Sequence, residues 1–84
     1  MNTSFAIMND TGKELIIVHE PECTEFVLPI GDEVIVEIDS CVDSIAIRVN
    51  HEDNQSRIAL LGHKGLYNVF YKGEAAFEEW LYNF

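Results

Sequence analysis

The stretch 24–38 reads TEFVLPIGDEVIVEI and decides the fold class that we expect for this chain. On both sides of Pro29-Ile30-Gly31-Asp32, apolar and polar residues alternate, which is the pattern of strands that bury one face. Pro and Gly in the centre favour a turn. The stretch therefore predicts an antiparallel hairpin of two strands, 24–28 and 33–38, joined by that turn.

Similar signals for strands and turns recur along the chain about every ten residues, which is typical of an all-β sandwich or barrel. We expect further strands at 5–8, 15–18, 44–50, 57–61 and 66–71, the second of them central and covered on both faces. We therefore predict a single domain over residues 1–84, mainly β. Its form would be a small antiparallel sandwich or a partly open barrel of about six or seven strands.

The period of the apolar residues changes near the C-terminus. Phe77, Trp80, Leu81 and Phe84 are spaced as on one face of a helix. Glu74 would lie in the first turn of this helix, where the helix dipole favours negative charge. We therefore predict one C-terminal amphipathic helix that docks its aromatic face on the sheet.

The chain is strongly acidic, with a formal net charge of −10 over 84 residues. This charge argues against binding to nucleic acid or to an anionic membrane surface, because both would repel it. Nine acidic residues and no Lys or Arg lie between Lys13 and Arg48, threaded through apolar residues in strand-like order. An acidic face on a folded domain predicts a positively charged partner, although the same charge can also serve only to keep a small β-rich domain in solution.

The predicted hairpin would carry this acidic face. Because residues i and i+2 of a strand point to the same side, Val34, Val36 and Ile38 would face inward, together with Phe26 and Leu28. The outer side would combine carboxylates with apolar residues, as protein interfaces often do. Its members are our candidate partner-binding residues: Glu25, Val27, Glu33, Ile35, Glu37 and Asp39. The alternative is that Val27 and Ile35 are covered by another strand or by the C-terminal helix.

No pattern for catalysis or metal binding stands out. Five side chains are of metal-ligand type, but their spacing fits no zinc pattern: His19, Cys23, Cys41, His51 and His63. The carboxylates around Asp32 lack the spacing of a calcium loop. Neither a nucleophile motif nor a phosphate loop is present. We therefore expect a protein that is not an enzyme and that holds no metal or cofactor.

The turns of the first forty residues resemble a pattern in small, uncharacterised bacterial β-proteins. In those, an N-x-T-G turn leads to a strand, an E-P stop and an L-P-x-G hairpin; the matching residues here are Asn9-Asp10-Thr11-Gly12, Glu20-Pro21 and Leu28-Pro29-Ile30-Gly31. Ile30 departs from the pattern, since a second Pro is common there. The resemblance implies a compact bacterial β-fold and transfers no activity. In size, acidity and lack of an active site, the chain is also similar to immunity proteins of bacterial toxins and to small phage-type inhibitors, which often cover a basic, nucleic-acid-binding cleft.

These observations predict an acidic binding protein, an inhibitor or immunity-type protein that covers a basic surface of a protein partner such as a nucleic-acid-binding toxin or effector. Two alternatives stay open: a self-associating structural subunit, joined as a homodimer through a sheet edge or the Trp80 helix face, and a small-ligand barrel that uses His19, Cys23 or His63. No signal peptide and no membrane span is visible in the sequence. We therefore expect a cytoplasmic location, where Cys23 and Cys41 stay reduced.

Overall fold

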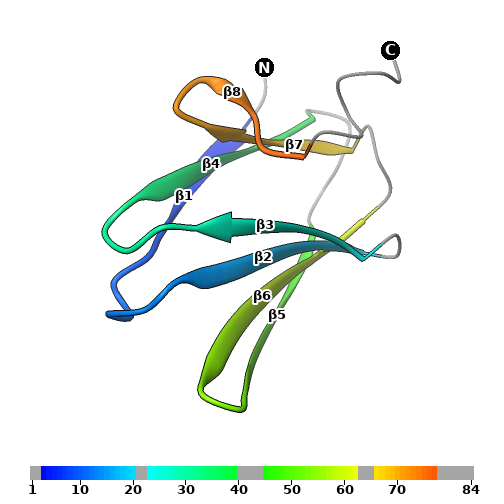
Figure 1. The fold of residues 1–84 in the computed structure, drawn as a ribbon. Coiled ribbons are helices and arrows are strands. Elements are labelled where there is room, and N and C mark those ends of the chain that lie inside the picture. The colour runs from blue at the N-terminus through cyan, green and yellow to red at the C-terminus, as the bar shows by residue number, and fades with distance from the viewer. Residues whose placement is uncertain (1–2, 21–22, 40–44, 63–65, 78–84) are drawn as a thin grey trace.

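The chain folds into eight β-strands (Figure 1). The structure is a computed structural model that describes residues 3–20, 23–39, 45–62 and 66–77. The strands are β1 (Thr3–Met8), β2 (Leu15–Glu20), β3 (Thr24–Leu28), β4 (Glu33–Ile38), β5 (Ala46–Glu52), β6 (Gln55–Leu61), β7 (Tyr67–Tyr71) and β8 (Glu74–Ala75). The prediction of a mainly β fold is confirmed, and the short β8 brings the number of strands above the number that we expected.

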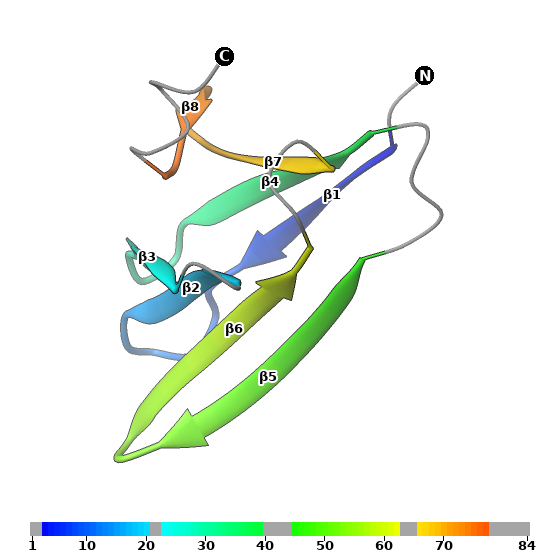
Figure 2. The same ribbon diagram turned by 90° about the vertical axis from the view of Figure 1, so that its right-hand side faces the viewer.

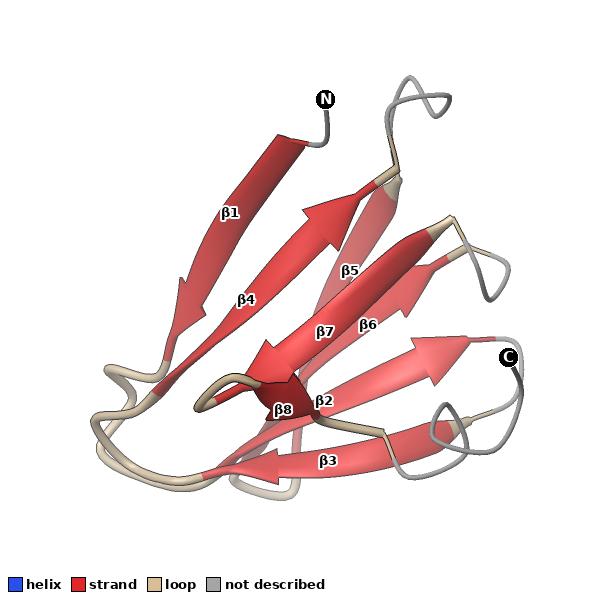
Figure 3. Cartoon of the chain, turned by 90° about the horizontal axis from the view of Figure 1, so that it is seen from above, coloured by secondary structure: helices blue, strands red, loops and turns tan. Residues whose placement is uncertain are grey.

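The strands form two sheets that pack face to face (Figures 1 and 3). One sheet has the order β1-β4-β7-β8 and is called the β4 sheet below; the other has the order β3-β2-β6-β5 and is called the β2 sheet. Neighbouring strands are antiparallel except for β2 and β6, which are parallel. The described residues therefore form an open sandwich and no closed barrel, and the expected antiparallel pairing was wrong at β2 and β6.

The hairpin predicted for residues 24–38 is not formed. Within the described residues β3 pairs with β2, whereas β4 pairs with β1 and β7 in the other sheet. The segment from Pro29 to Asp32, with Gly31 at a φ of +82°, therefore carries the chain from one sheet to the other. The alternation correctly predicted that Leu28, Val34 and Val36 face the core, but alternation does not specify the partner strand.

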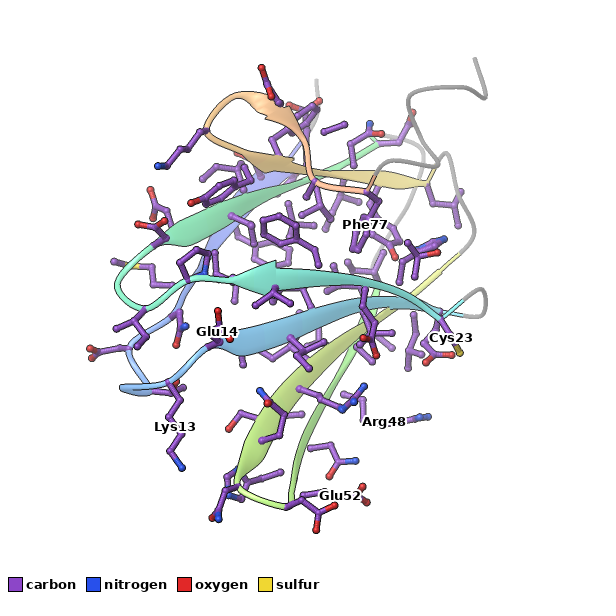
Figure 4. All side chains as sticks on the ribbon, viewed as in Figure 1. Lys13, Glu14, Cys23, Arg48, Glu52 and Phe77 are labelled. Atoms are coloured by element: carbon purple, nitrogen blue, oxygen red, sulfur yellow. The ribbon has the colours of Figure 1, made fainter. Side chains whose placement is uncertain are left out.

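The core fills the space between the two sheets. Burial of one aliphatic side chain there stabilises the fold by about 1.5–3 kcal/mol. Phe77, which follows β8 and is 1% exposed, points into this space (Figure 4). The fully buried aliphatic members of the cluster come from both sheets: Ile17, Leu28 and Leu60 from the β2 sheet, and Val34, Val36 and Val69 from the β4 sheet.

A buried polar contact also ties the sheets together. The Tyr67 hydroxyl donates a hydrogen bond to the carbonyl oxygen of Leu60 at 3.1 Å. The same hydroxyl is also hydrogen-bonded to Nδ1 of His19. All three residues are fully buried, so each of these polar groups needs a partner inside the protein. Since Tyr67 lies on β7 while His19 and Leu60 lie on β2 and β6, this contact fixes one sheet against the other.

The Asn9 side chain joins two turns at one end of the sandwich. It is 2% exposed, its Nδ2 lies 2.9 Å from the carbonyl oxygen of Leu28, and its Oδ1 accepts hydrogen bonds from Thr11. The backbone N–H of Asn9 donates to the carbonyl of Asp32 at 2.9 Å, and its carbonyl accepts from Gly31 at 3.0 Å. The N-x-T-G and L-P-x-G turns are therefore joined by hydrogen bonds, although they lie about twenty residues apart in the sequence.

The described residues do not show the predicted C-terminal helix. Glu74, which we expected in its first turn, lies in β8 and pairs with Tyr71 of β7. Lys72 and Gly73 between them both have positive φ, which is the geometry of a tight type I′ hairpin turn and not of a helix start. Residues 78–84, which hold most of the expected helix, lie outside the described residues.

Candidate interaction surface

The structure separates the predicted partner-binding residues into two groups on opposite outer faces of the sandwich. Glu25 and Val27 lie on β3, on the outer face of the β2 sheet, while Glu33, Ile35 and Glu37 lie on β4, on the outer face of the β4 sheet. The single acidic face that we expected is therefore wrong, because the two strands that would have carried it belong to different sheets.

Neither apolar member of the predicted set is covered by the described residues. Val27 is 45% exposed and Ile35 is 37% exposed. The alternative that another strand covers them is therefore wrong for the described part of the chain. Asp39 follows β4 and is half-buried, and its backbone N–H donates to the carbonyl of Leu66 at 2.9 Å.

Ile35 lies at the centre of an apolar row that crosses the outer face of the β4 sheet. Its direct neighbours are Ala6 of β1 and Phe70 of β7, and Phe70 is paired in turn with Ala75 of β8. Residues directly opposite each other in adjacent strands point to the same face, so the four side chains form one continuous row. We call this row, together with its flanking residues Met8, Glu33 and Glu37, the β4 face.

Carboxylates border the apolar row on both sides. Glu33 pairs with Met8, which is 69% exposed, and Glu37 pairs with Ser4 and Asn68. The β4 face is therefore an apolar centre with one glutamate on each side. The sequence predicted the alternation of Glu33, Ile35 and Glu37, but it missed the apolar neighbours that the strand order supplies.

A hollow lies at the Glu33 end of the β4 face. Its volume is about 440 Å³, and it is lined by Met8, Gly31, Asp32, Glu33, Ile35, Phe70, Tyr71, Lys72 and Gly73. The hydroxyl of Tyr71 donates a hydrogen bond to the Asp32 carboxylate, which favours the protonated phenol and raises the pKa of Tyr71 above 10.0. The ammonium group of Lys72 lies 5.3 Å from the centre of the Tyr71 ring. The lining of the hollow therefore combines the carboxylates of Asp32 and Glu33 with the ammonium group of Lys72.

The outer face of the β2 sheet has a different charge pattern. Glu25 pairs with Arg57 at 2.7 Å, with both side chains nearly half exposed. Arg48 lies near this pair, around a small hollow in which Val18 is 5% exposed. Because basic residues already balance the carboxylates here, Glu25 and Val27 are less suited than the β4 face to hold a basic partner.

The side chains that we considered as metal ligands do not share a site in the described residues. His19 is fully buried against Tyr67, whereas Cys23 is exposed and its sulfur lies 3.7 Å from the Glu20 carboxylate. His63 and Cys41 lie outside the described residues. In the part that the structure describes, no group of three or more His, Cys, Asp or Glu side chains is arranged to hold a metal ion.

No family model matches the chain, and neither a curated protein nor a solved structure matches it. Among the described residues there is no helix of the length and apolar character that crossing a membrane requires.

Proposed function

We propose that this protein is a non-enzymatic binding protein whose β4 face covers a basic surface of a protein partner, in the manner of an inhibitor or immunity protein. One observation carries the proposal: the apolar row around Ile35, which is itself 37% exposed, lies between Glu33 and Glu37 on an outer sheet face that no described strand covers. Apolar centres with a polar rim are typical of protein interfaces.

The apolar row would supply the contact area. A sheet face is preorganised, so its side chains lose little freedom on binding, and Ile35 is held between two neighbouring strands. Met8 is more exposed and unbranched, which allows it to adapt to the shape of a partner. We therefore expect Ile35 and Met8 to contribute affinity that depends little on salt.

The carboxylates would supply orientation and speed of association. Glu33 and Glu37 are four residues apart on one strand, a distance of about 13 Å. That distance exceeds a Debye length of about 8–10 Å at ordinary ionic strength, so each glutamate would pair with its own Lys or Arg. The net charge of −10 would attract a basic partner from a distance, and this attraction would weaken as salt is added.

The kind of partner follows from the charge. A surface that binds nucleic acid is basic and exposed, and a carboxylate-bearing face of this type can occupy it in place of phosphates. A nucleic-acid-binding toxin or effector therefore fits the β4 face. Glu25 and Val27, on the opposite side of the sandwich, are not part of this proposed interface.

The test is affinity capture from the lysate of the source cell, with elution by a salt gradient. Three immobilised proteins are compared: the wild type, the variant Glu33→Lys/Glu37→Lys, and the control Asp10→Lys/Glu14→Lys. The control makes the same change in net charge at two exposed positions outside the β4 face. A basic protein should be retained by the wild type and the control, with at least tenfold weaker binding to the β4-face variant, which is a loss of about 1.4 kcal/mol or more.

A second pair of variants tests the apolar row. Ile35→Ala should weaken binding of the captured protein without changing its dependence on salt, whereas Val27→Ala, a similar truncation on the opposite face, should leave the affinity unchanged. Equal capture by the wild type and both charge variants, or no basic protein retained by any of the three, would contradict the proposal.

A further inference from the structure

β5 is an edge strand of the β2 sheet, and it is exposed along its whole length. All seven of its residues are exposed, on both faces of the β2 sheet, and Val49 reaches 74%. One edge of β5 pairs with β6, while its other edge faces no strand in the described part of the chain (Figure 2). An edge strand of this kind is a template for pairing with a further strand.

The turn of the β5–β6 hairpin determines which backbone groups lie along the open edge. Asp53 and Asn54 both have positive φ and form a two-residue turn, so Glu52 and Gln55 are a hydrogen-bonded pair. Hydrogen-bonded and non-hydrogen-bonded pairs alternate along an antiparallel ladder. The backbone N–H and C=O groups that point outward are therefore those of Ile47, Val49 and His51.

The charge distribution favours a second copy of this chain at the β5 edge. The hairpin over residues 46–61 contains two acidic residues, Glu52 and Asp53, and two basic residues, Arg48 and Arg57. It is therefore neutral, and the whole formal charge of −10 belongs to the rest of the chain. Two copies would repel each other through their acidic surfaces and least through this hairpin.

The side chains of β5 also select one register. If Asn50 lies on a two-fold axis, Arg48 of each copy is directly opposite Glu52 of the other, which makes two complementary pairs. Centring the axis on Arg48 would place the two arginines opposite each other, and centring it on Val49 would give no charged pair. Both Arg48 and Glu52 extend from β5 into solvent (Figure 4), and neither has an ion-pair partner within 4.0 Å among the described residues.

We propose that two copies of this protein pair antiparallel through β5, with Asn50 on the two-fold axis, and so join their β2 sheets into one continuous sheet. In this register Val49 of one copy forms a hydrogen-bonded backbone pair with His51 of the other. The outward N–H and C=O groups of Val49 and His51 are then paired in both copies, and part of the exposed apolar surface of Val49 is covered. The β4 face lies on the other sheet, so this proposal does not depend on the proposed binding to a basic partner.

Cysteine cross-linking tests the register. Asn50 would face its own copy in a non-hydrogen-bonded pair, with Cα atoms about 4.5 Å apart, which is within the range that a disulfide requires. In a Cys23→Ser/Cys41→Ser background, Asn50→Cys should form a disulfide-linked dimer under mild oxidation. Val49→Cys in the same background should not, because the two cysteines would be offset by two residues. Cross-linking of Val49→Cys but not of Asn50→Cys would overturn the proposed register.

Analytical ultracentrifugation of the purified protein tests the association itself. Arg48→Glu and Glu52→Arg should each weaken the dimer at least tenfold, since each replaces two attractive pairs by two repulsive ones. The double exchange Arg48→Glu/Glu52→Arg should restore the dimer, while Lys13→Glu, an exposed charge reversal outside β5, should change it little. A wild type that stays monomeric at millimolar concentration, or a double exchange that fails to restore the dimer, would overturn the proposal.

Discussion

Replacement of Asn9 by Ala should cost about a quarter to three quarters of the stability of the fold. The Asn9 amide nitrogen faces three carbonyl oxygens, those of Lys13 at 2.8 Å, Leu28 at 2.9 Å and Pro29 at 3.2 Å, and its oxygen accepts two hydrogen bonds from Thr11. The amide has two hydrogens, so two of the three carbonyls are satisfied at a time. In the variant, water can replace part of the two Thr11 bonds, so that these count as about one lost hydrogen bond in addition to the two bonds to carbonyls. At about 1 kcal/mol for each net hydrogen bond, the total loss is about 3 kcal/mol.

That loss is large for a domain of this size. At about 0.05–0.15 kcal/mol per residue, the 84-residue chain has a total stability of about 4–13 kcal/mol. Urea unfolding followed by far-UV circular dichroism measures the difference, with an unchanged m-value showing that the unfolded state is the same. Asn68→Ala, at an exposed position of β7, is the control and should stay within about 0.5 kcal/mol of the wild type.

A second variant at Asn9 separates the roles of its two polar atoms. Asn9→Asp keeps an acceptor for Thr11 but turns an oxygen instead of the amide nitrogen toward the carbonyls. It should therefore be at least as unstable as Asn9→Ala at neutral pH. If Asn9→Ala loses less than about 1 kcal/mol, or if Asn9→Asp is as stable as the wild type, the account of Asn9 as the link between the two turns is wrong.

Three other contacts give smaller, separately measurable effects. Tyr67→Phe should lose about 1–3 kcal/mol in urea unfolding, because it removes a buried hydroxyl that bonds to Leu60; a loss below that range would argue against the contact as a tie between the sheets. Asp32→Asn should lower the pKa of Tyr71, because it removes the carboxylate that accepts the hydrogen bond of the Tyr71 hydroxyl. The titration of Tyr71 is measured from phenolate absorbance, as the difference between the wild type or Asp32→Asn and the same protein with Tyr71→Phe. Equal pKa values of Tyr71 in the wild type and in Asp32→Asn would contradict the hydrogen bond. Since the folded-state pKa of Tyr71 is raised above 10.0, its contribution to stability is fully present below that pH and is lost as the pH rises through the folded value. Glu25→Gln should cost no more than about 1 kcal/mol in unfolding experiments, because its pair with Arg57 is exposed; a larger cost would mean that this pair is more important than its exposure indicates.

Local patterns in the sequence predicted which side chains are buried, but not which strands are neighbours. The alternation along β4 correctly placed Val34 and Val36 in the core, because burial of one face is a property of each strand by itself. The pairing of β4 with β1 and β7 depends on contacts between residues far apart in the sequence. A turn such as Pro29–Asp32 can either fold a hairpin within one sheet or cross between two sheets, and the alternating pattern is the same in both cases.

The candidate interaction surface shows the same division. The position of Ile35 between Glu33 and Glu37 follows from the period of one strand. The apolar neighbours Ala6 and Phe70 could not be predicted, because they are brought beside Ile35 by the strand order of the β4 sheet. The wrong prediction at Glu74 has a local cause instead. An acidic residue is favourable at the start of a helix, but Lys72 and Gly73 form a tight turn, and Glu74 begins a strand after it.

The most direct test of the proposed function is a methyl NMR footprint of the protein bound to the basic partner that the capture experiment retains. On addition of that partner, the methyl signals of Ile35 and Met8 on the β4 face should shift or broaden. Those of Val27 on the opposite face and of Val49 on β5, which are also exposed, should stay unchanged. Shifts confined to Val27 or Val49, with Ile35 and Met8 unaffected, would contradict binding through the β4 face.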